Sequence, residues 1–106
     1  MLFELRQYKS KPGLRDQLVE VMETKVLPYQ MSMGIAVVAS FVAEDDPDGY
    51  VWIRRFESAE ERDRLTTAVY GSEEWTEVIR PLLEPVFDRE AMVVTTLLPT
   101  QVSPLH

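Results

Sequence analysis

Residues 48–62 decide the fold of this chain, and they read DGYVWIRRFESAEER. From Tyr50 to Phe56 the residues are aromatic or β-branched apart from two arginines, a composition that favours a half-buried strand over a helix. Ser58 is followed three residues later by Glu61, which is the capping-box pattern of a helix N-terminus. The sequence therefore predicts a strand that ends near Phe56 and a helix that begins at Ser58.

Two earlier stretches predict the first strand and the first helix. Residues 2–8 alternate between two faces, which indicates a strand. Residues 14–29 repeat apolar side chains at helical spacing, after a Pro-Gly pair that can open a helix. Pro28 lies inside this pattern, so we expect the helix to kink or end near Leu27, with a last turn that can run on to Gly34.

The middle and the end of the chain supply the remaining elements. Residues 35–43 are almost continuously apolar, and the acidic turn after them predicts a hairpin with the strand at residues 50–56. The second helix should stop at Gly71, and a short helical piece should follow it and end at Pro81. After a connector, residues 91–98 predict the fourth strand.

The resulting order, β-α-β-β-α-β, is that of a ferredoxin-like α+β sandwich, in which two helices cover one face of a four-stranded antiparallel sheet. A length of 106 residues fits a single domain. We expect this domain to span residues 1–98, and we expect residues 99–106 to form a C-terminal tail that frays or reaches over a neighbour.

Three of the predicted strands carry apolar side chains on both faces, and the helices can cover only one of them. Leaving several large side chains per strand in water would forfeit roughly 1.5–3 kcal/mol each and would expose an unusually large apolar patch. A second copy of the chain is the simplest cover, so we expect a homodimer in which two open sheet faces close a dimeric α+β barrel. The opposed sets are Ile35, Val37, Ala39 and Phe41 against Ala36, Val38 and Val42; Tyr50, Trp52 and Phe56 against Val51 and Ile53; and Met92, Val94 and Leu98 against Val93 and Leu97.

Composition argues against several classes of partner. Acidic residues outnumber basic ones 18 to 11, and the net charge of −7 repels nucleic-acid backbones and anionic membrane faces. No apolar run approaches the ~20 residues that span a bilayer, so we expect no membrane insertion. The N-terminus has no signal-peptide pattern, and the chain has no cysteine for disulfides or thiolate chemistry. We therefore expect a cytoplasmic protein.

Four segments, in order and at the right spacing, resemble the NIPSNAP family within the wider dimeric α+β barrel superfamily. They are residues 3–8 (FELRQY), 11–13 (KPG), 52–62 (WIRRFESAEER) and 74–75 (EW). The family tends to begin with tyrosine where this chain has Phe3. The resemblance covers about residues 3–98 and implies a small bacterial protein with a ferredoxin-like, dimeric fold. It implies no reaction, because the family has no general activity to carry over.

The sequence offers few groups for metal binding or catalysis. The only histidine, His106, is the last residue, which counts against haem, zinc and a serine or cysteine triad. The acidic run at residues 44–48 lacks the glycine and the distal glutamate of a calcium-binding loop, so a solvated turn is the simpler interpretation. The four glycines are isolated and predict no phosphate-binding loop. We therefore expect neither a cofactor nor a metal.

A set of polar and aromatic side chains can line a pocket between the sheet and its helices. Small-ligand sites are mostly apolar with a few placed polar groups, and this set has that character. For most members packing is the simpler role, with the tryptophans as core anchors and the arginines paired with Glu4 or Glu57. The ligand-binding candidates are Arg6, Tyr8, Tyr50, Trp52, Arg54 and Trp75, with Tyr29 and Tyr70 in the wider set.

Arg6, Tyr8 and Arg54 are the favoured functional residues, because polar groups in strand centres need partners when they are buried. One function that fits is a non-catalytic protein that binds a small apolar or aromatic ligand between sheet and helices. The alternative is a cofactor-independent, monooxygenase- or isomerase-like enzyme on a small aromatic substrate, in which Tyr8 exchanges a proton while an arginine holds an anion. The non-catalytic interpretation also includes a module that presents its acidic helices to a protein partner, and a third possibility is a stable dimer whose role the sequence does not indicate.

Overall fold

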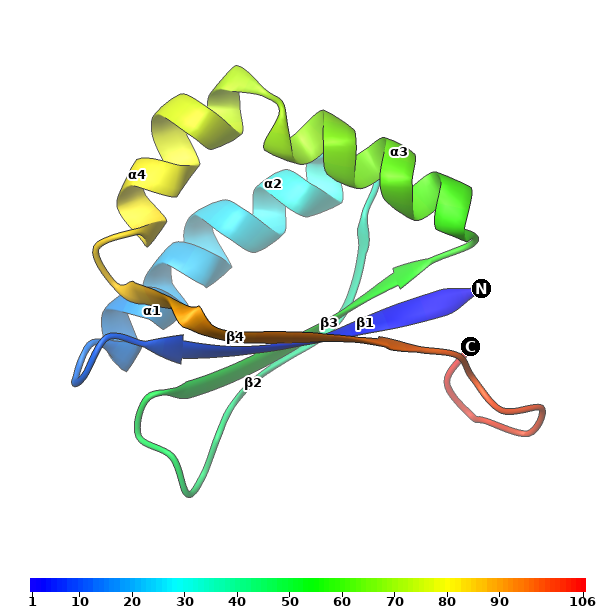
Figure 1. Cartoon of the computed structure of the whole chain (residues 1–106), viewed down its shortest axis with the longest axis horizontal. Coiled ribbons are helices and arrows are strands. Elements are labelled where there is room, and N and C mark those ends of the chain that lie inside the picture. The colour runs from blue at the N-terminus through cyan, green and yellow to red at the C-terminus, as the bar shows by residue number, and fades with distance from the viewer.

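A computed structural model describes residues 1–106 and contains a four-stranded antiparallel sheet with helices on one face (Figure 1). The strands are β1 (Leu2–Ser10), β2 (Ala36–Val42), β3 (Gly49–Phe56) and β4 (Phe87–Leu97), in the spatial order β2-β3-β1-β4. The helical segments are α1 (Arg15–Val21), η1 (Met22–Val26), α2 (Leu27–Ser32), α3 (Ala59–Tyr70), η2 (Glu74–Ile79) and α4 (Arg80–Leu83). The ferredoxin-like α+β class predicted from the sequence is confirmed. No helix combines the length and the apolar character that crossing a lipid bilayer requires.

The junction between β3 and α3 forms as the capping pattern predicts. The Ser58 hydroxyl accepts a hydrogen bond from the Glu61 amide at 3.1 Å. The Glu61 carboxylate reaches back to accept from the amide of Glu57 at 3.3 Å, one residue earlier than the capping-box pattern places it. One first-turn amide and the amide that precedes the N-cap are thereby satisfied, which favours a helix start at this point.

The two prolines within the helical runs lie in first turns of short helices. Pro81 does not end its helix as predicted but lies in the first turn of α4, and Pro28 occupies the same place in α2, where the helix runs on to Ser32. Each of these short helices directly follows a π-helical segment, η1 or η2. A proline removes one amide donor and its ring crowds the carbonyl four residues earlier, and a wider π turn moves that carbonyl away. The disturbance expected near Leu27 is therefore a π-helical segment within a continuous helix.

The fourth strand begins at Phe87, four residues before the predicted start at residue 91. Its early part pairs Lys9 with Asp88 and Ser10 with Phe87, beyond an irregularity in the register. The charged residues 88–90 hide this part of the strand from a pattern search, because charge is unfavourable in a typical strand. Pairing with β1 supplies the backbone hydrogen bonds that the local sequence does not predict.

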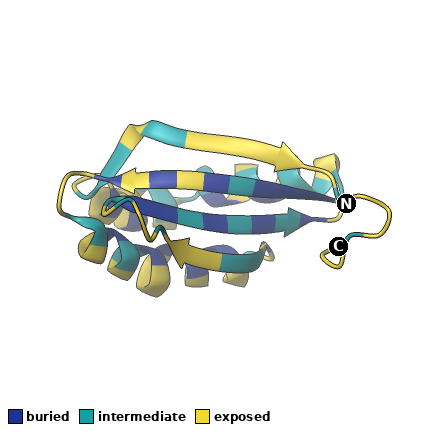
Figure 2. Cartoon of the chain, turned by 90° about the horizontal axis from the view of Figure 1, so that it is seen from below, coloured by how far each residue is buried: buried dark blue, intermediate teal, exposed yellow.

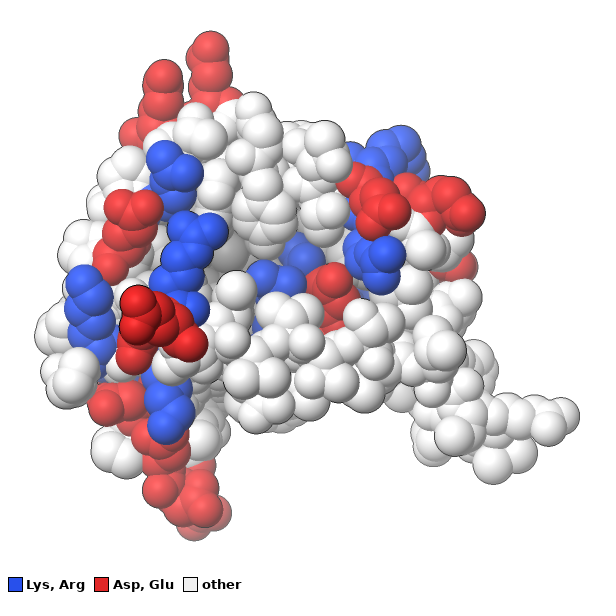
Figure 3. Space-filling model, in the orientation of Figure 1, with Lys and Arg blue, Asp and Glu red and all other residues white.

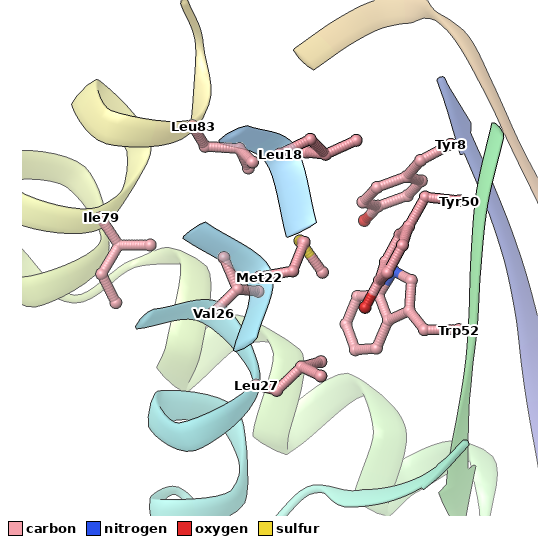
Figure 4. Packing of buried hydrophobic residues seen from close by; sticks show 9 residues of the cluster. All are labelled: Tyr8, Leu18, Met22, Val26, Leu27, Tyr50, Trp52, Ile79 and Leu83. Atoms are coloured by element: carbon pink, nitrogen blue, oxygen red, sulfur yellow. The ribbon is translucent and has the colours of Figure 1, made fainter. Parts of the chain in front are cut away.

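Two apolar clusters fill the space between the sheet and the helices. Figure 4 shows the larger one, in which the aromatic rings of β1 and β3 face the helix side chains. Its members are Tyr8, Leu18, Met22, Val26, Leu27, Tyr50, Trp52, Ile79 and Leu83. The smaller cluster consists of Leu2, Ile35, Phe56, Leu65 and Val69. β1 and β3 thus contribute to both clusters, with Tyr8, Tyr50 and Trp52 in the larger one and Leu2 and Phe56 in the smaller one.

The opposite face of the sheet has no helical cover, and Figure 2 looks onto it with the helices behind the strands. The register places Phe3, Leu5 and Gln7 of β1 on this face, beside the odd-numbered residues 51–55 of β3 and 93–97 of β4. Large apolar side chains are exposed here: Phe41 is 55%, Val93 53% and Leu97 41% exposed. We call this surface the open face.

Candidate functional site

A layer of polar side chains separates the two apolar clusters in the middle of the helix-facing side of the sheet. Glu4 and Arg6 come from β1 and Arg54 comes from β3, and Glu4 and Arg54 are direct cross-strand partners. All three are buried, and Arg54 is only 1% exposed. Gln30 and Tyr70 complete this polar layer from the helices.

Glu4 is the single acid at the centre of the polar layer. Its Oε1 atom accepts from Arg54 Nε at 2.9 Å, from Arg54 Nη2, and from Arg6 Nη1 at 3.2 Å. The sequence left open whether the arginines pair with Glu4 or Glu57. Both Arg6 and Arg54 bind Glu4, and Glu57 pairs with the outward-facing Arg55 at 3.0 Å.

The remaining donors of Arg54 bind the helix layer. Its Nη1 atom donates to Gln30 Oε1 at 2.9 Å and to the Tyr70 hydroxyl at 3.0 Å. Gln30 Nε2 also donates to the Tyr70 hydroxyl, at 3.1 Å. The guanidinium lies 5.3 Å from the Trp52 ring centroid and 5.4 Å from that of Phe56, so its faces are covered by aromatic rings. Arg54 therefore connects the sheet to the helices, and each of its three nitrogens has at least one acceptor.

Arg6 is held less completely. Its Nε atom donates to the Tyr8 hydroxyl at 3.1 Å and its Nη1 atom to Glu4. Its Nη2 atom has only the thioether sulfur of Met92 at 3.8 Å, and a thioether is a weak acceptor. Two guanidinium groups thus share one buried carboxylate. Arg6 is the one of the two whose positive charge is less completely paired.

A cleft of about 490 Å³ opens beside Arg6, between the helices and the β4 side of the sheet. Figure 3 shows a hollow below the helices, with basic side chains beside it. Its volume lies within the range of about 300–1,000 Å³ that small-molecule sites occupy. Its walls are Arg6, Tyr8, Tyr70, Trp75, Arg80, Leu83, Glu84, Phe87, Arg89 and Met92.

Three of the six predicted candidates line this cleft. Arg6 and Tyr8 reach it from β1, and Trp75 reaches it from η2, where its ring packs edge-on against Tyr70 at 4.9 Å between centroids. Tyr8 also packs against the ring of Phe87 at 4.6 Å. The structure therefore brings these three side chains together around one space.

The other three candidates lie behind the cleft and do not line it. Tyr50 and Trp52 belong to the larger apolar cluster, and the Tyr50 hydroxyl lies 2.6 Å from that of Ser40. Arg54 is enclosed by its own partners. The distinction is one of position across the sheet, since Arg6 and Tyr8 on β1 are the direct cross-strand neighbours of Trp52 and Tyr50 on β3, and only the β1–β4 side borders the cleft.

Sequence reasoning missed the residues that α4 and β4 contribute to the cleft. These are Arg80, Leu83 and Glu84 from the end of the second helical run, and Phe87, Arg89 and Met92 from β4. Most of them fall in stretches assigned to a connector or to a short helical piece that ended at Pro81. The early start of β4 places Phe87 and Arg89, and the helix that continues past Pro81 places Arg80, Leu83 and Glu84. No periodic pattern in residues 84–90 indicates the early start. Nowhere do three histidine, cysteine or acidic side chains gather as a metal site.

Burial raises the pKa of Tyr8, the nearby Arg6 guanidinium opposes this rise, and Tyr70 adds to it. The net effect is a pKa above the usual value near 10. The hydroxyl is therefore protonated at neutral pH. Its oxygen accepts from Arg6, and its own hydrogen has no acceptor in the protein.

Raised tyrosine pKa values make the folded protein sensitive to alkali. Burial raises the pKa of Tyr50 as well, against the opposing effect of its bond with Ser40. Because the unfolded chain releases these two protons first, the contribution of the two tyrosines to the free energy of unfolding should be constant below about pH 10 and should fall above it. Urea unfolding at a series of alkaline pH values measures this slope, and the Tyr8→Phe variant should have a shallower one. An equal slope in both proteins would contradict the assignment to Tyr8.

The fold and the site together define a ferredoxin-like α+β protein with a ligand-sized cleft between its helix layer and one edge of its sheet. The sequence pattern of the NIPSNAP family matches residues 3–104. The chain therefore belongs to the NIPSNAP family, as its four characteristic segments indicated. No functionally curated protein matches the sequence.

Solved structures share this fold over nearly the whole chain. A protein from Agrobacterium tumefaciens has a TM-score of 0.88 at 24% identity, with 100% of both chains covered. A NIPSNAP-like domain protein from Burkholderia xenovorans, described as uncharacterized, has a TM-score of 0.85 at 24% identity, covering 97% of this chain and 88% of its own. An antibiotic biosynthesis monooxygenase has a TM-score of 0.66 at 20% identity, with 92% and 96% covered. At these identities the likeness concerns the fold.

Proposed function

We propose that this protein binds a small apolar or aromatic molecule in the cleft between helices and sheet. The cleft itself is the observation that carries the proposal, because it is large enough for such a ligand and joins apolar walls to a few placed polar groups. Leu83, Phe87 and Met92 offer apolar contact, and Trp75 offers a flat aromatic surface. Arg6 and Tyr8 supply the polar groups on the floor.

The two tryptophans of the chain give this proposal an internal control. Trp75 lines the cleft, whereas Trp52 is fully buried behind it. Titration with naphthalene-2-carboxylate and 2-naphthylmethanol, followed by the two indole N–H signals in NMR spectra, should shift the Trp75 signal more than the Trp52 signal. Calorimetry then gives the affinity of each probe.

A blocked variant tests whether binding takes place in the cleft. Met92→Trp fills the space with a larger side chain and should abolish binding of both probes. Met31→Trp makes the same substitution on α2, where Met31 is 51% exposed, and should leave binding unchanged. Binding that survives in the Met92→Trp variant, or no binding of either probe to the parent protein, would refute the proposed function.

We further propose that the protein works as a homodimer through its open face. The exposed Phe41, Val93 and Leu97 side chains support this arrangement, because they form an apolar surface that a second copy of the same sheet would match by two-fold symmetry. The cleft lies on the helix side and stays accessible in such a dimer.

A cofactor-independent enzyme on a small aromatic substrate is the second candidate. The contact between Tyr8 and Arg6 favours it, since a protonated phenol beside a guanidinium can hand a proton to a bound anion. The fold shared with an antibiotic biosynthesis monooxygenase is consistent with such an activity. Mass spectrometry of aromatic probes after incubation with the protein in air tests it. Probes recovered unchanged argue for binding alone, and turnover that Tyr8→Phe abolishes argues for catalysis.

A further inference from the structure

We propose that the cleft selects molecules that carry a carboxylate, and that Arg6, Tyr8 and Tyr70 form the place where this carboxylate binds. The inference rests on the ligand-binding function proposed above and names the chemical class of the ligand. Three independent features of the site lead to it: its charge, its unused hydrogen-bond donors, and the apolar walls that adjoin them.

The charge around the cleft is positive in a protein that is acidic as a whole. Arg6, Arg80 and Arg89 line the cleft, and Glu84 is the one acid among its walls. Glu84 is already paired with Arg80 at 3.4 Å. Beneath the floor, Glu4 is shared between Arg6 and Arg54, and a guanidinium keeps its charge in any protein environment. The site therefore carries more positive than negative charge, and an anionic ligand would balance it.

The floor of the cleft also has donors without acceptors. Arg6 Nη2 has only the sulfur of Met92 as partner. The hydroxyl oxygens of Tyr8 and Tyr70 accept from arginine, and neither hydroxyl hydrogen has an acceptor in the protein. Such a surface suits a group that only accepts, which an ionised carboxylate does and an alcohol or amine does not.

The apolar walls determine the rest of the ligand. Leu83, Phe87 and Met92 adjoin the donor groups, and Trp75 closes the helix side of the space. A flat or apolar body can lie against these side chains while its carboxylate points to the floor. The matching ligand is thus a small aromatic or apolar carboxylic acid.

Three naphthyl probes of nearly equal shape separate charge from size. Naphthalene-2-carboxylate should bind about tenfold or more tightly than 2-naphthylmethanol in calorimetry near neutral pH, an effect typical of charge-assisted hydrogen bonds in a buried site. The cationic 2-naphthylmethylammonium should bind most weakly. Equal affinities of the carboxylate and the alcohol would overturn the inference and leave the proposed ligand site in place. No binding of any probe would overturn the proposed function and the inference with it.

Arg6→Met identifies the group that holds the carboxylate. The variant leaves Glu4 and Arg54 as a balanced pair, so near-ultraviolet circular dichroism should remain native. The affinity for naphthalene-2-carboxylate should fall by about tenfold, and the affinity for 2-naphthylmethanol should stay within a factor of about two. A purely structural role of Arg6 would lower both affinities alike. Arg89→Met is the matched control on the rim, where screening by solvent limits the expected loss to about threefold. A larger loss in Arg89→Met than in Arg6→Met would overturn the assignment to the cleft floor.

Tyr70→Phe provides a second test of the carboxylate site if Arg6→Met proves unstable. It removes one hydroxyl and keeps the ring that packs against Trp75. Carboxylate affinity should fall by about threefold or more with alcohol affinity unchanged. An unchanged carboxylate affinity would exclude Tyr70 from the site.

Discussion

Replacing Glu4 with glutamine is expected to lower the free energy of unfolding by about 3–5 kcal/mol, the cost of leaving a buried charge without its partner. Glu4 Oε1 is the only carboxylate oxygen that either buried arginine contacts, and it accepts from both. Glutamine keeps an oxygen of similar size and can still accept a hydrogen bond, but it supplies no charge. Two guanidinium groups would then face each other in the core without an anion.

Urea unfolding followed by circular dichroism measures this loss, and Glu57→Gln is the matched control. Glu57 also pairs with an arginine, but its side chain is 61% exposed, so its removal should change the free energy of unfolding by less than about 1 kcal/mol. Similar losses in the two variants would show that the buried pair is no stronger than the surface pair. That result would contradict the electrostatic account of the polar layer.

Replacing Val93 with glutamate is expected to convert the proposed dimer into a monomer. Val93 lies on the open face and is 53% exposed in the single chain, so the monomer should tolerate glutamate with little change in stability. In a two-fold dimer the carboxylate would be buried twice, at about 3–5 kcal/mol for each unpaired charge. The dimer dissociation constant should therefore rise by at least about 10⁴-fold.

Sedimentation at micromolar concentration distinguishes the two states. The parent protein should sediment as a dimer and Val93→Glu as a folded monomer. Val78→Glu is the control with the same substitution, placed on the outer side of η2 where Val78 is 43% exposed, and it should remain dimeric. A parent protein that sediments as a monomer would contradict the proposed dimer.

Much of the fold could be predicted because its signals are local. The aromatic and β-branched run at residues 50–56 and the Ser58 cap each depend on neighbouring residues alone, and both appear in the structure at the predicted positions. The errors also have local causes. Charged residues at the start of β4 and the prolines at residues 28 and 81 mimic breaks, and long-range strand pairing and π-helical segments override them.

Only half of the candidate site could be predicted, because the residues that border the cleft are selected by how the helices pack on the sheet. Strand alternation places Arg6, Tyr8, Trp52 and Arg54 on the same face of the sheet, and it cannot tell which of them the helices cover. The observed helices enclose Trp52 and Arg54, and leave Arg6 and Tyr8 at a cleft that α4 and β4 complete.

The sequence by itself determined the order of the elements, the family and the chemical character of the helix-facing side of the sheet, because periodicity, capping and residue type act over a few positions. The tertiary structure alone decided that two arginines share one carboxylate, and that the less satisfied of the two borders a cleft. Those facts depend on how β1, β3 and the helices pack across the core. Contacts between residues far apart in the chain produce no local sequence pattern from which that packing could be predicted.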